Sequence, residues 1–100
     1  MSGTYCEVFG NTIENRILEY LLENQELDFA IGDIARELEI SRPKTYEVIK
    51  HFMEKGFVEK SRIIGRTQLI KLNKDNEIVK LFLKNFKACL RLACKELILN

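Results

Sequence analysis

The residues of this chain with the clearest chemical potential are the cations between positions 41 and 74. This segment carries nine Lys and Arg residues against three carboxylates, a net charge of +6, whereas residues 1–40 carry a net charge of −7. The whole chain carries only +1. A basic segment in a near-neutral chain is typical of a surface that binds a polyanion such as nucleic acid. A solvated charged surface without a partner is the alternative.

The sequence lacks the common catalytic and metal-binding patterns. It contains no GxxxxGK[ST] loop, no HExxH pair and only one histidine, so no nucleophile has an evident histidine partner. The cysteines Cys6, Cys89 and Cys94 form no C-x-x-C pair, and their odd number argues against a closed disulfide framework. We therefore expect no enzyme activity, no metal site and no cofactor. The cysteines are interpreted as small apolar side chains.

Hydrophobic periodicity and helix-end signals predict the elements that would position the basic segment. Asn11, with Glu14 three residues later, predicts the start of a first helix. Ser41 followed by Pro43 is the strongest helix start in the chain, and Gly56 ends that helix. The predicted elements are helices at 12–23, 32–38, 41–55 and 77–97, an extended segment at 27–30 and a hairpin at 57–72.

The predicted fold is mainly α with a small β-hairpin, an α+β class, in a single domain of residues 1–100. The hairpin surrounds Gly65, and its register stays open between a two-residue turn at Ile64 and Gly65 and a longer turn. No apolar stretch is long enough to span a membrane. The first residues lack the basic and apolar regions of a signal peptide, so we expect a cytoplasmic location.

Two stretches resemble the winged helix-turn-helix family of transcription regulators, with its archaeal multiple-drug-resistance and arsenic-repressor branches as the nearest comparison. Residues 31–41, IGDIARELEIS, resemble the family's positioning helix and turn, I-x-x-I-A-x-x-L-x-I-S. Residues 42–58, which end in MEKGFV, resemble its recognition helix and the entry into its wing. The resemblance covers about residues 12–72 and departs from the pattern at Glu39, where many members have Gly.

The resemblance implies a winged helix-turn-helix core at residues 8–74. In the family, the helix corresponding to 41–55 enters the major groove of double-stranded DNA. The hairpin at 57–72 corresponds to the wing, which lies against the DNA backbone or the minor groove.

The local chemistry supports this assignment. Ser41 leaves backbone N–H groups free for a phosphate at the helix start, where Arg42 and Lys44 reach a phosphate or a guanine edge. Tyr46 either packs or contacts DNA, and Glu47 either accepts from cytosine or pairs with a neighbouring lysine. The hairpin adds two arginines that bracket its tip. The predicted DNA-binding residues are Ser41, Arg42, Pro43, Lys44, Tyr46, Glu47, Lys50, Lys60, Arg62 and Arg66.

The last predicted helix is about 31 Å long at 1.5 Å per residue. Its five cations form one stripe, and its apolar arc is too wide for a single contact with a small domain. We expect residues 76–98 to pair with a second copy of the chain, with Asn85 setting the register. A basic amphipathic helix on an anionic membrane is the alternative. The predicted interface is Ile78, Leu81, Phe82, Asn85, Phe86, Cys89, Leu90, Ala93 and Leu97.

These expectations combine into a homodimeric, sequence-specific regulator of transcription that binds a near-palindromic site in double-stranded DNA. No small-molecule ligand is evident from the sequence. The competing hypothesis is a winged-helix protein–protein interaction module inside a larger assembly, without direct DNA binding, because the fold alone does not decide the partner.

Overall fold

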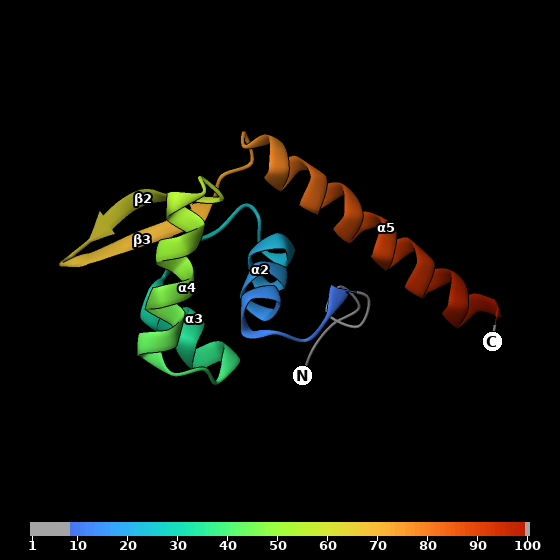
Figure 1. Cartoon of the computed structure of the whole chain (residues 1–100), viewed down its shortest axis with the longest axis horizontal. Helices are drawn as coiled ribbons and strands as arrows, with labels where there is room; N and C mark the ends of the chain where they lie inside the picture. The colour runs from blue at the N-terminus through green and yellow to red at the C-terminus, as the bar shows by residue number, and fades with distance from the viewer. Residues whose placement is uncertain (1–8, 100) are drawn as a thin grey trace.

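The structure is a computed structural model that describes residues 9–99, with side chains described for residues 9–95. Helices and a small antiparallel sheet form the body, and a long helix projects from it (Figure 1). This arrangement confirms the predicted α+β class and the added C-terminal helix. The elements are α2 (Ile13–Glu23), β1 (Asp28–Ala30), α3 (Ile31–Leu38), α4 (Arg42–Glu54), β2 (Val58–Ile64), β3 (Thr67–Leu72) and α5 (Glu77–Leu99).

Helix α2 begins one residue later than its predicted cap implies. The Oγ1 atom of Thr12 accepts a hydrogen bond from the backbone N–H of Asn15 at 3.1 Å, and Thr12 has an extended backbone. The prediction of Asn11 as the cap is therefore wrong, because the neighbouring hydroxyl takes that position. The buried face of α2 is the predicted one and includes Ile17 and Leu21.

The turn between α3 and α4 keeps the geometry that the helix-turn-helix resemblance implies. Helix α3 starts directly after β1, one residue earlier than predicted, and ends at Glu39 in the left-handed conformation with φ 55° and ψ 45°. The N–H of Ile40 donates to the carbonyl of Ala35 at 2.9 Å. A glutamate thus occupies a backbone position that glycine adopts more easily.

Helix α4 has the predicted bounds within one residue at each end. The Oγ atom of Ser41 accepts from the N–H of Lys44 at 3.3 Å, and Pro43 lies in the first turn. Gly56, with φ 77°, follows the helix and turns the chain into β2. The buried face consists of Thr45, Val48, Ile49 and Phe52, as the periodicity predicts.

The sheet has the strand order β1-β3-β2, and both strand pairs are antiparallel. Ile64 pairs with Thr67, so the hairpin turn consists of Gly65 and Arg66. The sequence left open a two-residue turn at Ile64 and Gly65 or a longer turn. The turn has two residues and lies one position later, and Gly65 supplies its positive φ of 63°. A bulge interrupts the pairing of β2 between Lys60 and Ile63.

Among the described side chains of helix α5, the buried ones lie between Val79 and Cys89. The side chain of Asn76 accepts from the N–H groups of Ile78 and Val79 at 2.8 and 3.1 Å and so caps the start of α5. Val79 and Phe86 belong to the core cluster formed with α2, α4 and the sheet. The rest of α5 extends away from the body, on the side opposite the hairpin tip (Figure 1).

Candidate nucleic-acid interface

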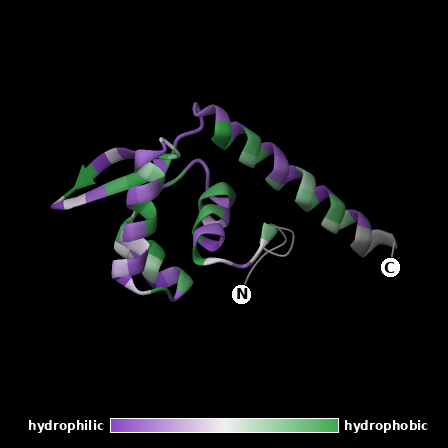
Figure 2. Ribbon diagram, in the orientation of Figure 1, coloured by the Kyte–Doolittle hydropathy of each residue, from purple (hydrophilic) through white to green (hydrophobic). Residues whose placement is uncertain are grey.

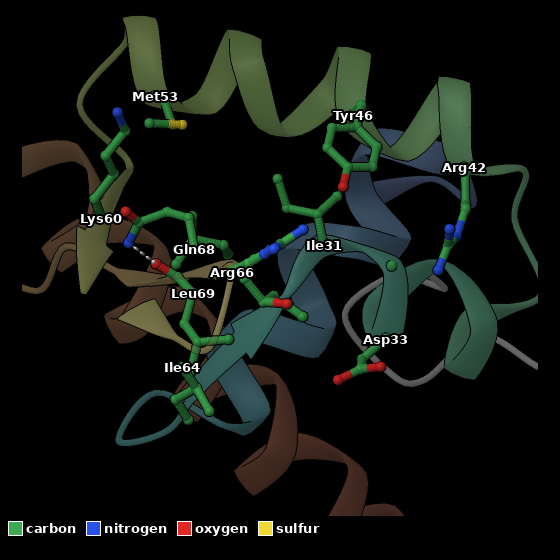
Figure 3. Close-up of a pocket in the computed structure, with 14 residues that line it drawn as sticks. Ile31, Asp33, Arg42, Tyr46, Met53, Lys60, Ile64, Arg66, Gln68 and Leu69 are labelled. Carbon is green, nitrogen blue, oxygen red and sulfur yellow. Dashed lines mark hydrogen bonds between the residues drawn. The ribbon is translucent and has the colours of Figure 1, made fainter. Parts of the chain in front are cut away.

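A cleft of about 670 Å³ lies between α4, the start of α3 and the hairpin. Its apolar lining includes Ile31, Met53 and Leu69. Tyr46 projects from α4 into it and is 53% exposed (Figure 3). The remaining polar lining comes mainly from α4 and from the hairpin strands, which are brought together by the packing of α4 on β2 and by the pairing of β3 with β1.

Three predicted DNA-binding cations meet at this cleft: Arg42 from α4, and Lys60 and Arg66 from the hairpin (Figure 3). Among the described residues, none of the three forms an ion pair with a carboxylate. Asp33 also lines the cleft, but its carboxylate pairs with Arg36 at 2.6 Å. The cleft therefore presents positive charge that the described part of the chain does not neutralise.

The guanidinium of Arg42 lies against the start of α3. A Cβ atom added at Gly32 would lie 2.7 Å from Nη2 of Arg42. The absence of a side chain at Gly32 thus leaves the space that this guanidinium occupies at the mouth of the cleft. Sequence patterns assigned Gly32 only to a helix start, because its proximity to Arg42 arises from the packing of α3 on α4.

Other predicted DNA-binding side chains are engaged within the chain. Nζ of Lys44 lies 3.5 Å from Glu47 and 3.9 Å from Glu14. Of the two roles left open for Glu47, the structure shows the pairing with a neighbouring lysine. Lys50 is exposed on α4, and within the described residues it forms no ion pair. Ser41 and Pro43 are exposed at the start of α4, as predicted.

Arg62 bonds to a carboxylate on the opposite edge of the sheet. Its Nε and Nη2 atoms donate to Asp28 at 3.0 and 3.3 Å, and the hydroxyl of Ser61 also donates to Asp28. These hydrogen bonds, from Arg62 first and then Ser61, lower the pKa of Asp28, and the same pair raises the pKa of Arg62. The pair joins β2 to β1 across the intervening strand β3.

Sequence reasoning missed three features of this surface. Asp28 was assigned only to an extended segment, and its partner Arg62 lies 34 residues away along the chain. Ile63 was treated as part of the hairpin and Ile64 as a strand or turn residue, and their exposure of 66% and 54% was not anticipated. Gln68 was not singled out, yet it lines the cleft. The alternation of apolar and polar residues at 27–30 and the β-favouring runs around Gly65 were the only local signals for these positions.

The predicted dimer residues on α5 divide into two groups. Phe86 and Cys89 are buried within the single chain, and Phe82 and Ala93 are half-buried. The exposed members are Ile78, Leu81, Asn85 and Leu90. Leu97 lies outside the residues whose side chains are described. Leu92, which was not in the predicted set, is 61% exposed.

The exposed side chains on one face of α5 have heptad spacing. Ile78, Leu81, Asn85 and Leu92 are exposed, Ala88 between them is half-buried, and the five are separated alternately by three and four residues, the pattern of a coiled-coil seam. This face adjoins the buried face that packs on α2. One part of the apolar arc of α5 therefore packs on the body, and the other part faces away from it. The basic stripe of α5 lies on the remaining side of the helix.

The described residues contain neither a cluster of metal ligands nor a membrane-spanning helix. No group of three or more His, Cys, Asp or Glu side chains in this part of the chain could hold a metal ion. None of its helices is long and apolar enough to cross a membrane.

Comparison with known families gives one match over most of the body. The family model described as "Sugar-specific transcriptional regulator TrmB" matches residues 11–72, from the start of α2 to the end of β3. This segment contains the two stretches that carry the helix-turn-helix resemblance. A search of curated protein sequences finds no match.

Solved structures of transcription regulators share the fold. MepR of Staphylococcus aureus, a regulator of the multidrug efflux pump MepA, is 22% identical with a TM-score of 0.66 over 92% of this chain and 67% of its own. The MepR–DNA complex matches with 18% identity and a TM-score of 0.64, over 93% of this chain and 66% of that one. HlyU of Vibrio vulnificus is 19% identical with a TM-score of 0.60, over 85% and 82%. The winged-helix fold predicted from the sequence is thereby confirmed.

Proposed function

This chain belongs to the family of the sugar-specific transcriptional regulator TrmB, and from that premise we propose that it is a homodimeric regulator that binds double-stranded DNA. The observation that carries the proposal is the convergence of Arg42, Lys60 and Arg66 on one cleft without carboxylate partners among the described residues. Cations without carboxylate partners at a concave surface are suited to binding a phosphate backbone.

In this proposal, α4 enters the major groove. Arg42, Tyr46 and Lys50 recur every four residues and therefore lie along one side of the helix, and all three are exposed. A helix of 13 residues is about 20 Å long and fits a groove about 12 Å wide. Arginine and lysine at such positions read guanine edges or hold phosphates.

The hairpin then lies across the neighbouring strand of the duplex. With α4 in the major groove, the cleft between α4 and the hairpin straddles one sugar-phosphate backbone. Lys60 and Arg66 face that backbone from the hairpin, and Arg42 faces it from α4. Contacts to phosphates fix the register of the protein without reading sequence, so the hairpin contributes mostly sequence-independent affinity.

The dimer forms through residues 76–98, which we assign as the dimerisation helix beside the core at 8–74. Exposed Ile78, Leu81 and Leu92 supply an apolar seam at heptad spacing, and exposed Asn85 in the same seam sets its register. The family match ends at residue 72, ahead of this helix. MepR was solved bound to DNA, and its likeness to this chain includes most of the chain's length.

A twofold dimer would place two α4 helices on half-sites about 34 Å apart, one turn of the duplex, so we expect a near-palindromic site. We propose no sugar ligand for this chain, because the matched segment consists of the helices and strands to which the DNA contacts are assigned.

The test is a titration of the full chain against labelled genomic fragments at about 50 and 200 mM salt. Three phosphate-facing cations in each of two protomers should make the affinity fall roughly a thousandfold between these conditions. A matched titration of Arg42→Ala/Arg66→Ala should show both weaker binding and a shallower salt dependence.

If no fragment binds even at low salt, DNA binding is wrong and the winged-helix protein–protein module takes its place. If binding occurs but is indifferent to salt, the cleft is not the phosphate-binding surface, and the assignment of its three cations fails.

A further inference from the structure

The tip of the hairpin exposes two large apolar side chains. Ile63 and Ile64 are 66% and 54% exposed, and they precede the turn formed by Gly65 and Arg66. Figure 2 shows this hydrophobic end of β2 at the part of the hairpin that projects farthest from the body. Neither residue belongs to the core cluster or to the half-buried residues packed against it. The exposure therefore needs a reason outside the fold of the single chain.

The two side chains lie on opposite faces of the hairpin, because successive residues of a strand alternate in direction. Ile64 lines the cleft beside Thr67, and Ile63 pairs with Gln68 across the strand. Strand ends that face water usually carry charged or turn-forming residues. Here the apolar pair is followed within two residues by Arg66, whose guanidinium has no carboxylate partner within the described chain.

The size and charge of this patch narrow the choice of partner. Two side chains are far too few for a protein interface, which buries about 800 Å² per partner. They are enough for an apolar wedge, since one or two such residues inserted from the minor groove can part a base step. The cation beside them suits the negative potential of that groove.

We infer that the tip of the hairpin, with Ile63 on one face and Ile64 on the other, enters the minor groove of double-stranded DNA as an apolar wedge and kinks the duplex. The inference rests on the proposed function and adds to it a mode of sequence selection. Arg66 holds the adjacent phosphates while the isoleucine side chains displace water from the groove and open a base step. Flexible steps such as TA or CA kink at the lowest cost, so the hairpin favours sites that carry them where it lands.

The consequence is specificity at base pairs that α4 does not reach. In a dimer, the two hairpins lie at the two ends of the site, so the kinks fall on either side of the segment read in the major groove. The bend of the duplex would then depend on the uncharged isoleucine side chains. The salt dependence of DNA affinity would depend on the cations around them.

The experiment measures the bend by energy transfer between dyes at the two ends of a bound fragment of about 30 base pairs. The wild-type chain should bend the duplex by at least about 20°. The double variant Ile63→Thr/Ile64→Thr keeps β-branched residues in the strand and removes the apolar wedge. It should leave the duplex nearly straight while its salt slope stays at the wild-type value.

Arg66→Gln is the matched control, since it removes one charge and keeps both isoleucines. It should reduce the salt slope of the dimer by about two, one for each protomer, and preserve the bend. Replacing the flexible step with a stiff A-tract should weaken wild-type binding about fivefold and leave the double variant nearly unaffected.

Each result separates the wedge from the proposed function. If the chain binds DNA and the duplex stays straight, or if the double variant bends it as the wild type does, the wedge is wrong and DNA binding stands. If the chain binds no DNA, both proposals fail. Loss of self-association in the double variant, with the bend unchanged, would assign the tip to a second copy instead.

Discussion

The hairpin and α5 project from opposite sides of one body, and both combine exposed apolar residues with cations (Figure 1). In the hairpin the two kinds are mixed: Ile63 and Ile64 adjoin Arg66 within four positions. In α5 they are separated, with a seam that includes Leu81 on one side and a stripe that includes Lys87 on another. The same residue types thus make two different surfaces.

This difference indicates how the arrangement of charged and apolar residues on a surface selects its partner. A surface where charge and apolar groups share one small footprint suits a groove whose walls are anionic and whose floor is made of bases. A surface where they are separated suits an apolar partner on one side and water on the other. We therefore assign nucleic acid to the hairpin and a second copy of the chain to α5.

The largest expected effect comes from a charge placed in the α5 seam. Leu81 is 58% exposed, so Leu81→Arg should leave the single chain folded while it strands a cation in the dimer contact. The variant should sediment as a monomer at micromolar concentration. Its affinity for a two-half-site fragment should fall by roughly 10²- to 10⁴-fold, since simultaneous engagement is lost.

Lys87→Glu is the control for this comparison, because it lies on the basic stripe and should leave the dimer intact. Phe86→Arg is unsuitable as a probe, since Phe86 is only 7% exposed and the change would damage the core. A dimer that survives Leu81→Arg, or a wild-type chain that is monomeric, would break the assignment of α5.

The next largest effect is a difference in DNA affinity between variants of two cations in the first turn of α4. Arg42 has no carboxylate partner among the described residues, whereas Lys44 lies within 4 Å of both Glu47 and Glu14. Arg42→Ala should weaken DNA binding by about tenfold and reduce the salt slope of the dimer by about two, one for each protomer. Lys44→Ala should change affinity by about threefold or less, because its charge is already shared. If titration shows that both variants lose the same DNA affinity, the ion pairs of Lys44 within the chain do not reduce its contribution to DNA binding.

A smaller effect, of opposite sign, is expected at Asp28. Asp28→Asn removes the carboxylate that holds Arg62, so this arginine gains freedom to reach a phosphate. Affinity for non-specific DNA at low salt should rise about threefold, with a salt slope steeper by up to about two for the dimer, one for each protomer. Weaker binding by Asp28→Asn would mean instead that the pair orients the hairpin for DNA.

The pH dependence of this pair follows from its pKa shifts. The folded chain lowers the pKa of Asp28, so the stability from the pair is fully present above the unfolded pKa, near 3.9, and is lost as the pH falls through the folded value. Arg62 stays charged throughout, since its pKa is raised. Between pH 6 and 8 the effect of Asp28→Asn on DNA affinity should therefore be constant.

The body of the molecule could be predicted from its sequence because its signals are local. Ser41 and Pro43 mark a helix start within three residues, and the stripe containing Val48 and Phe52 marks its buried face. The hairpin followed from β-favouring runs around Gly65. Such signals depend on neighbours along the chain, so they survive without knowledge of the tertiary structure.

What could not be predicted depends on contacts between distant segments. The pairing of Arg62 with Asp28 requires the strand order β1-β3-β2, which brings both edges of the sheet within reach of one side chain. The burial of Phe86 and the exposure of Leu81 on the same apolar arc depend on where α2 meets α5. The cap at Thr12 instead of Asn11 was a choice between two adjacent polar residues that both suit the position.

The smallest expected effect tests the body that carries both projections. Glu39 ends α3 with a φ of 55°, a left-handed conformation that costs a residue with a Cβ atom about 1 kcal/mol. Its carboxylate also lies at the negative end of the helix dipole. Glu39→Gly removes both penalties, and Glu39→Gln removes only the charge while it keeps the Cβ atom. Glu39→Gly should therefore exceed Glu39→Gln in thermal midpoint by roughly 4–8 °C for a gain near 1 kcal/mol.

The bend of bound DNA and the dimer should be unchanged in both variants, since Glu39 belongs to neither projection. If the glutamine variant is as stable as the glycine variant, charge alone explains the gain and the turn holds no backbone strain. If either variant alters DNA binding, the turn and the hairpin are coupled, and the two projections cannot be treated as separate surfaces on a passive body.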